Sequence, residues 1–118
     1  MKDCRIYHNP RCSKSRQTLA LLQENGIEPQ VVLYLDNPPD GKTLQQLLQK
    51  LGIGARELLR KGEDEYKSLN LADASLSEAQ LIEAMVQHPR LIERPIVEAG
   101  RRAVLGRPPE NVLALIHD

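Results

Sequence analysis

The chain has 118 residues, of which 41% are hydrophobic and 27% charged, and these are ordinary proportions for one globular domain spanning residues 1–118. Its 16 basic and 16 acidic side chains cancel, and it contains three Tyr but neither Trp nor Phe. Nucleic-acid-binding proteins normally have a basic excess and aromatic rings that stack on bases, so this composition argues against that class.

A parallel β-α-β unit is predicted for the first third of the chain. Residues 5–7 are apolar enough for a strand, and the stretch SKSRQTLALLQENG at 13–26 has good helix formers up to Gly26, a natural helix stop. The stretch QVVLYL at 30–35 is β-branched and bounded by prolines, as is typical of a second strand. Strand, helix and strand within about 30 residues predict two parallel strands.

The middle of the chain is predicted to be helical. One helix has an apolar face with the spacing i, i+3, i+4 and i+7, made of Leu44, Leu47, Leu48 and Leu51. Residues 55–61 are expected to form a second helix and residues 63–71 a short turn. Ser77, with Gln80 three residues later, is typical of a capping box that begins a third helix, which Pro89 ends. The apolar stripe of that helix consists of Leu81, Ile82, Met85 and Val86.

A hairpin and a final helix are predicted for the rest. Residues 94–98 and 102–105 flank Gly100 as two strands, and RPPENVLALIHD at 107–118 has prolines near the first turn of a helix. The element order is therefore a βαβ unit, a helical insertion and a ββα unit. This α/β arrangement with a mixed sheet predicts a thioredoxin-like fold.

Cys12 lies at the predicted start of the first helix, in a loop at the carboxyl end of a strand, where open α/β folds bind ligands. Helix N-termini favour anions. Several groups that are or can become positive lie nearby in sequence: His8, Arg11, Lys14 and Arg16. We therefore expect a reactive thiol with a pKa below that of free cysteine and a hydrogen bond from the Ser15 hydroxyl to its sulfur. The alternative is an inert, buried thiol.

Cys4 has no polarising neighbours, so we expect it to be an inert core residue. A strand rises about 3.3 Å per residue, which places Cys4 ~10 Å from Tyr7 before the loop to Cys12 begins. A disulfide needs Cα atoms within about 7 Å of each other, so a Cys4–Cys12 bridge is not expected. Because Ser15 stands three residues after Cys12, the site is predicted to be monothiol and to need a thiol from outside.

Four stretches of the chain resemble the glutaredoxin-linked arsenate reductase family of thioredoxin-like proteins, which includes small chromosomal members. They are IYHNPRCSKSR at 6–16, ELLRKGEDEYKSLNLAD at 57–73, HPRLIERPIV at 88–97 and GRPPENVL at 106–113. The resemblance implies that the Cys12 thiolate attacks arsenate, that glutathione then adds as cosubstrate, and that arsenite leaves. Glutaredoxin would reduce the mixed disulfide left on Cys12, and no bound cofactor or metal is implied.

The same resemblance assigns roles to further residues. His8 and Ser15 match residues that stabilise the thiolate in this family. The residues that match its anion-binding arginines are Arg60, Arg94 and Arg107. Guanidinium groups suit a tetrahedral oxyanion because they donate bidentate hydrogen bonds and keep their proton. Arg94 and Arg107 each precede a proline, which favours an extended backbone, and Pro95 matches the family's cis-proline. The alternative is that each arginine is an ordinary surface charge.

Two other functions stay open. One is a glutathione-dependent thiol oxidoreductase with another substrate, and the other is a redox regulator that binds RNA polymerase. Regulators of this fold typically carry Cys-x-x-Cys, whereas residue 15 is serine here, so an enzyme is favoured.

A cytoplasmic protein without membrane contact is expected. The first ten residues lack the apolar stretch of a signal peptide, and the longest apolar run, VVLYL at 31–35, is far shorter than the roughly 20 residues of a membrane helix. Two cysteines are also too few for a disulfide framework.

Overall fold

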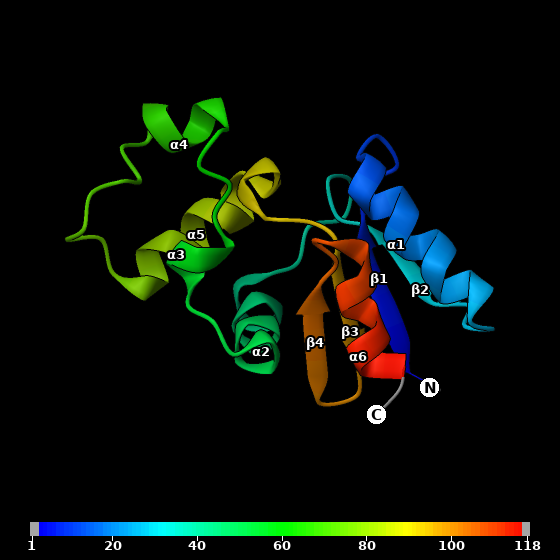
Figure 1. Ribbon diagram of the computed structural model, residues 1–118. Coiled ribbons are helices and arrows are strands. Elements are labelled where there is room, and N and C mark those ends of the chain that lie inside the picture. Colours follow the sequence, from blue (N-terminus) through cyan, green and yellow to red (C-terminus); the bar gives the residue numbers. More distant parts are fainter. Residues whose placement is uncertain (1–2, 117–118) are drawn as a thin grey trace. The chain divides into compact units, whose positions relative to one another are not determined.

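The computed structural model describes residues 3–116. Its internal contacts divide the chain into two compact units. The sheet unit combines the residues up to Asn37 with those from Arg94 onward, and the helical unit is Pro38–Glu93. Figure 1 shows the strands in the first of these and helices α2 to α5 in the second.

The sheet unit contains one four-stranded sheet in the order β2-β1-β3-β4. Its strands are β1 (Cys4–His8), β2 (Gln30–Leu33), β3 (Ile96–Ala99) and β4 (Arg102–Leu105). β1 runs parallel to β2 and antiparallel to β3, and β3 runs antiparallel to β4. The predicted mixed α/β sheet with a parallel β-α-β unit is therefore confirmed.

Helices pack against this sheet around one apolar core. α1 (Ser13–Glu24) follows β1, and the chain closes with the 3₁₀ helix η2 (Pro109–Val112) and α6 (Leu113–Ile116). The core cluster joins buried side chains from β1, β3, α1, η2 and α6, which are Cys4, Ile6, Leu22, Val97, Val112 and Leu115. The last helix was predicted over 107–118; it begins later because Pro108 and Pro109 open it as a 3₁₀ turn, and residues 117–118 lie outside the described part.

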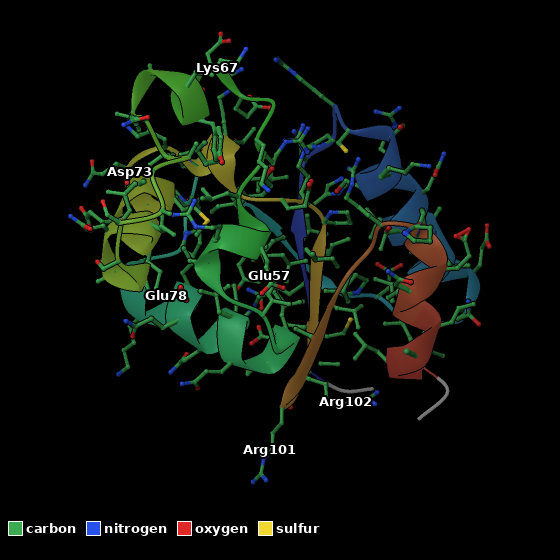
Figure 2. The ribbon with its side chains drawn as sticks, turned by 60° about the vertical axis from the view of Figure 1, so that its left-hand side comes forward. Glu57, Lys67, Asp73, Glu78, Arg101 and Arg102 are labelled. Carbon is green, nitrogen blue, oxygen red and sulfur yellow. The ribbon has the colours of Figure 1, made fainter. Side chains whose placement is uncertain are left out.

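The hairpin between β3 and β4 turns at Gly100, as the sequence predicts. Gly100 has φ +61°, a left-handed conformation that glycine adopts without steric cost. The exposed Arg101 side chain extends away from the hairpin tip (Figure 2). Arg102 instead turns back along the unit, where its Nη2 donates a hydrogen bond to the carbonyl oxygen of Ala114 (2.9 Å).

The helical unit contains five short helices. They are α2 (Gly41–Leu51), α3 (Ala55–Leu58), α4 (Asp64–Ser68), α5 (Glu78–Gln87) and the 3₁₀ helix η1 (Pro89–Leu91). The predicted capping box is confirmed at the start of α5, where Ser77 Oγ accepts from the Gln80 N–H (3.2 Å) and Gln80 Oε1 accepts from the Ser77 N–H (2.8 Å). Within residues 3–116, no helix is both long and apolar enough to cross a membrane.

The strand predicted at 94–98 is Ile96–Ala99 in the structure. The second strand and the second helix of the insertion end earlier than predicted, each because hydrogen bonds redirect the backbone. The strand predicted at 30–35 ends at Leu33, whose carbonyl oxygen accepts from the N–H groups of Asp36 (3.0 Å) and Asn37 (2.9 Å) in a turn. The helix predicted at 55–61 ends at Leu58. Its next residue, Leu59, instead forms an antiparallel bridge with Ile92.

Candidate active site

Cys12 is the N-cap residue of α1, in the loop that leaves the carboxyl end of β1. Its backbone is extended (φ −94°, ψ 121°), and its carbonyl oxygen accepts the first helical hydrogen bond, from Arg16 N (3.0 Å). Its own N–H donates to the carbonyl oxygen of Asn9 (3.0 Å). The side chain is partly exposed, so a thiolate at the helix N-terminus is accessible to a reactant.

Hydrogen bonds to the sulfur lower the pKa of Cys12. Partial burial opposes ionisation and is the largest single influence, but it is outweighed by donors that favour the thiolate. These donors are the backbone N–H groups of Ser15 and Lys14 and the side chain of Arg94, whose positive charge adds to the effect. The lowering of the Cys12 pKa therefore has two physical sources, which are the first turn of α1 and an arginine from a distant part of the chain.

Arg94 and Arg107 meet at the sulfur. Arg107 Nη1 lies 3.8 Å from Cys12 Sγ and also donates to the carbonyl oxygen of Arg94 (3.3 Å). The two peptide bonds that follow these arginines, Arg94–Pro95 and Arg107–Pro108, are both cis, and the second of these was not anticipated from the sequence. Two guanidinium groups beside a cysteine sulfur can donate hydrogen bonds to the oxygens of an anion at that sulfur.

His8 and Ser15 form a buried pair beneath the cysteine loop. His8 Nδ1 and Ser15 Oγ are 2.6 Å apart, and Ser15 Oγ also accepts from the Asn9 N–H (3.1 Å). The Ser15 hydroxyl was expected to donate to the sulfur; in the structure it bonds His8 and Asn9, and the sulfur receives the Ser15 backbone N–H instead. Ser15 thus couples His8 to the loop that carries Cys12.

Burial lowers the pKa of His8 below its ordinary value, and the positive charge of Arg16 adds to this lowering. Both influences favour the neutral imidazole over the charged form. The contact of His8 with Ser15 connects it to the turn that carries Cys12.

A junction of Thr18, Pro95 and Gly106, which the sequence analysis did not single out, connects the two arginines. The Gly106 N–H donates to the carbonyl oxygen of Pro95 (2.9 Å). Thr18 Oγ1 lies 2.8 Å from the carbonyl oxygen of Lys14, one turn earlier in α1, and 3.3 Å from that of Gly106. A Cβ on Gly106 would stand 2.5 Å from Thr18 Oγ1 and 2.8 Å from Pro95 Cγ. A glycine just before an Arg-Pro pair is the sequence signal for this close approach.

Arg60 belongs to the helical unit and is ion-paired there. Its Nε lies 3.3 Å from Glu63 Oε2, and its Nη1 lies 2.8 Å from Glu93 Oε1. Of the three arginines predicted to bind the anion, the structure brings Arg94 and Arg107 to Cys12 and gives Arg60 two carboxylate partners within its own unit.

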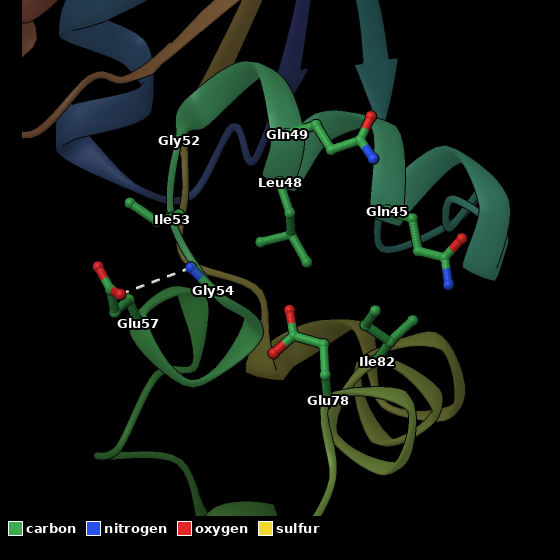
Figure 3. A pocket seen from close by; sticks show the side chains of 9 residues that line it. All are labelled: Gln45, Leu48, Gln49, Gly52, Ile53, Gly54, Glu57, Glu78 and Ile82. Atoms are coloured by element: carbon green, nitrogen blue, oxygen red, sulfur yellow. Dashed lines mark hydrogen bonds between the residues drawn. The ribbon is translucent and has the colours of Figure 1, made fainter.

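Each unit also contains a cavity. One of about 320 Å³ borders the loop before Cys12 in the sheet unit, and it is lined by residues His8 to Arg11, Leu33, Leu35 and Asp36. A more open one of about 590 Å³ lies in the helical unit (Figure 3). Its two carboxylates cap α3: Glu78 accepts from Ala55 N (3.1 and 2.9 Å) and Glu57 from Gly54 N (3.5 Å). Among residues 3–116 no group of His, Cys, Asp or Glu side chains could hold a metal ion.

The sheet order, the β-α-β unit and the cysteine at the start of α1 define a thioredoxin-like thiol protein. The family model described as the ArsC family matches residues 7–115, and the chain belongs to this family. "Uncharacterized protein YfgD" of Escherichia coli K12 is 63% identical over 116 residues, 98% of each chain. An arsenate reductase of Haemophilus influenzae is 51% identical over 94% of this chain and 97% of its own. The solved structure of the arsenate reductase from Vibrio cholerae is 52% identical, with a TM-score of 0.93 over 95% of this chain and 96% of that chain.

Proposed function

We propose that this protein is an arsenate reductase with Cys12 as its nucleophile. The observation that carries the proposal is the meeting of Arg94 and Arg107 at the Cys12 sulfur, which combines a stabilised thiolate with an oxyanion site. Relatives that are named arsenate reductases and match nearly the whole chain support it.

The proposed reaction transfers two electrons from two thiols to arsenic. The Cys12 thiolate attacks arsenate, a sulfur–arsenic bond forms, and one oxygen leaves as water after protonation. The glutathione thiolate then attacks the Cys12 sulfur, the sulfur–arsenic bond breaks, and its electron pair leaves with arsenic as arsenite, so that a disulfide between Cys12 and glutathione remains. A glutaredoxin thiol attacks this disulfide, takes over the glutathione and releases the Cys12 thiolate.

The chain's own residues serve the first step. The N–H groups of Ser15 and Lys14 hold the sulfur ionised, and the arginines neutralise the charge on the arsenate oxygens as the thiolate approaches. His8 supports the turn that carries Cys12 through its hydrogen bond with Ser15. Because reduced glutathione and glutaredoxin belong to reducing compartments, the proposal also places the protein in the cytoplasm.

A coupled assay tests the proposal. The protein is mixed with arsenate, glutathione, glutaredoxin, glutathione reductase and NADPH, and NADPH loss is followed at 340 nm. We expect arsenate-dependent loss with the parent and with Cys4→Ala, and none with Cys12→Ser. An absence of arsenate-dependent NADPH loss with the parent, the protein without substitutions, would contradict the proposal.

The second candidate is a glutathione-dependent thiol oxidoreductase with another substrate. The pairing of Arg60 with Glu63 and Glu93 favours it, because one of the three expected anion ligands is already neutralised. This alternative would be supported if the parent protein reduced a mixed disulfide with glutathione but showed no activity with arsenate.

A further inference from the structure

The cavity of about 320 Å³ in the sheet unit combines two parts of the chain. Residues His8 to Arg11, in the loop before Cys12, form one part of its lining, and Leu33, Leu35 and Asp36, at the carboxyl end of β2 and just beyond it, form the other. All of these residues belong to the sheet unit. The volume falls at the lower end of the range of small-molecule sites, which is about 300–1,000 Å³.

Three hydrogen bonds fix the loop side of this cavity. The Asn9 N–H donates to Ser15 Oγ (3.1 Å), and the Arg11 N–H donates to Asn9 Oδ1 (3.0 Å). Arg16 Nη1 donates to the carbonyl oxygen of Pro10 (2.8 Å). A ligand that enters the cavity therefore meets a largely preformed surface, as is usual for small-molecule sites.

The same loop connects the cavity to the Cys12 thiol. Arg11 directly precedes Cys12, and adjacent Cα atoms are about 3.8 Å apart. The Cys12 N–H also donates to the carbonyl oxygen of Asn9, another lining residue (3.0 Å). Because the Cys12 side chain is partly exposed, a molecule bound in the cavity can extend to it.

The lining combines two opposite charges with apolar surface. Arg11 contributes a guanidinium group and Asp36 a carboxylate, and within residues 3–116 neither group has an ion-pair partner. Leu33 and Leu35 leave 38% and 41% of their surface exposed. These groups suit a small zwitterion with an aliphatic part, whose carboxylate faces Arg11 and whose ammonium group faces Asp36.

A redox reaction at Cys12 also needs a second thiol from another molecule. Cys4 begins β1 and is buried in the core, whereas Cys12 follows the other end of this five-residue strand. The strand spans about 13 Å, so Cys4 is too far away to form a disulfide with Cys12. A two-electron reduction that leaves a disulfide on Cys12 therefore takes its second thiol from a molecule that binds beside it.

We propose that this cavity binds the thiol cosubstrate, a small peptide thiol that carries an ammonium group and carboxylates, as glutathione does. Arg11 pairs with a carboxylate, Asp36 pairs with the ammonium group, and the two leucines contact the aliphatic part. The inference rests on the proposed function, since it concerns the thiol of that reaction. The bound thiol loses its proton to water and attacks the Cys12 sulfur. A sulfur–sulfur bond forms, the sulfur–arsenic bond breaks, and its electron pair leaves with arsenite.

Binding is tested with S-methylglutathione, which has the charges of glutathione but no free thiol. Its protection of Cys12 from iodoacetamide is measured in a Cys4→Ala background, without substitution in the cavity and with Arg11→Gln or Asp36→Asn. The coupled assay gives KM for glutathione and for arsenate. Exchange of Cys12 with uncharged hydroxyethyl disulfide shows whether a substitution changes the thiol itself.

Two further variants are matched controls. Arg101→Gln and Asp64→Asn remove the same charges as the cavity variants, at exposed positions that do not line the cavity. An effect that these controls share comes from net charge alone.

We expect Arg11→Gln and Asp36→Asn each to raise KM for glutathione, and the S-methylglutathione concentration that half-protects Cys12, by about threefold to tenfold. KM for arsenate and the rate of exchange with hydroxyethyl disulfide should stay within about twofold. Acetylation of the amino group of S-methylglutathione should weaken protection by a similar factor. It should have no further effect in Asp36→Asn, because the partner of the ammonium group is already absent there.

Three results would overturn the inference. They are an absence of protection by S-methylglutathione, protection that is unchanged in both cavity variants, or equal losses in the two controls. The two proposals fail separately. Turnover of arsenate with an unchanged KM for glutathione in both cavity variants contradicts only the thiol site, whereas protection that weakens in those variants without any turnover contradicts only the reductase activity.

Discussion

Arg107 reaches the sulfur of Cys12 across 95 positions of sequence, with Nη1 and Sγ 3.8 Å apart. The same guanidinium donates to the carbonyl oxygen of Arg94 (3.3 Å), so its orientation is held by the segment that brings the other arginine to the sulfur. The loop before β3 and the loop after β4 therefore act together on the first turn of α1. The proposed oxyanion site would therefore depend on both loops.

Cys12 should be alkylated by iodoacetamide with a pH midpoint below that of free cysteine, because helix N–H groups and Arg94 stabilise its thiolate. The rate is followed in a Cys4→Ala background. Arg94→Gln should move the midpoint upward, since it removes a charged donor. A parent midpoint equal to that of free cysteine would refute the assignment of these donors.

Arg94→Lys and Arg107→Lys should each lower kcat/KM for arsenate about 10- to 150-fold, because a charge-assisted hydrogen bond contributes roughly 1.5–3 kcal/mol and lysine loses the bidentate geometry. Exchange of Cys12 with a neutral disulfide should change far less. Arg101→Lys, at the exposed hairpin tip, is the matched control, and Arg60→Lys should lie close to it. Equal losses toward arsenate and disulfide would mean that the arginines act on the thiol alone.

Oxidised glutathione should add one glutathione to the protein, on Cys12. Cys4 is buried in the core, and its burial raises the pKa of its thiol, so it should stay unmodified. Intact-mass spectrometry of the parent and of Cys12→Ser measures this, and glutaredoxin should restore the parent mass. A product lighter by two hydrogens and without glutathione would instead reveal a Cys4–Cys12 disulfide.

Acidification should destabilise the fold through His8. Because burial lowers the folded-state pKa of His8, the unfolded chain binds the proton more readily. The stability that neutral His8 contributes is fully present above its unfolded pKa of about 6.5 and is lost as pH falls toward the folded value. Urea unfolding at pH 7.5 and 5.5 measures this loss, which should be smaller in His8→Asn. An identical loss in both proteins would contradict it.

Thr18→Val should lower the free energy of unfolding by about 0.5–1.5 kcal/mol, because it removes a hydroxyl whose single hydrogen is shared between the carbonyl oxygens of Lys14 (2.8 Å) and Gly106 (3.3 Å). Ser68→Ala is the control, since its hydroxyl makes an exposed hydrogen bond to the carbonyl oxygen of Glu65 within α4 (3.4 Å). Urea unfolding compares the two. A cost for Thr18→Val no larger than that of the control would show that the junction contributes little.

The sequence by itself determined the features that depend on neighbouring residues. The parallel β-α-β unit, the capping box of Ser77 and Gln80, and the position of Cys12 at a helix start all follow from periodicity, propensity and capping chemistry over a few residues. The element ends at Leu33 and Leu58 were missed. The first depends on the hydrogen bonds of a local turn, and the second on a bridge to Ile92, far along the chain.

The tertiary structure decided which groups act on one another. The family resemblance predicted that His8, Ser15 and the arginines belong to the site. Only the folded structure shows that the Ser15 hydroxyl bonds His8 and that the Ser15 backbone N–H faces the Cys12 sulfur. Folding also brings Arg60 within hydrogen-bond distance of Glu93, which lies 33 positions away in sequence. A side chain with several possible partners takes the one that packing brings within hydrogen-bond distance, and residue type alone carries no information about that distance.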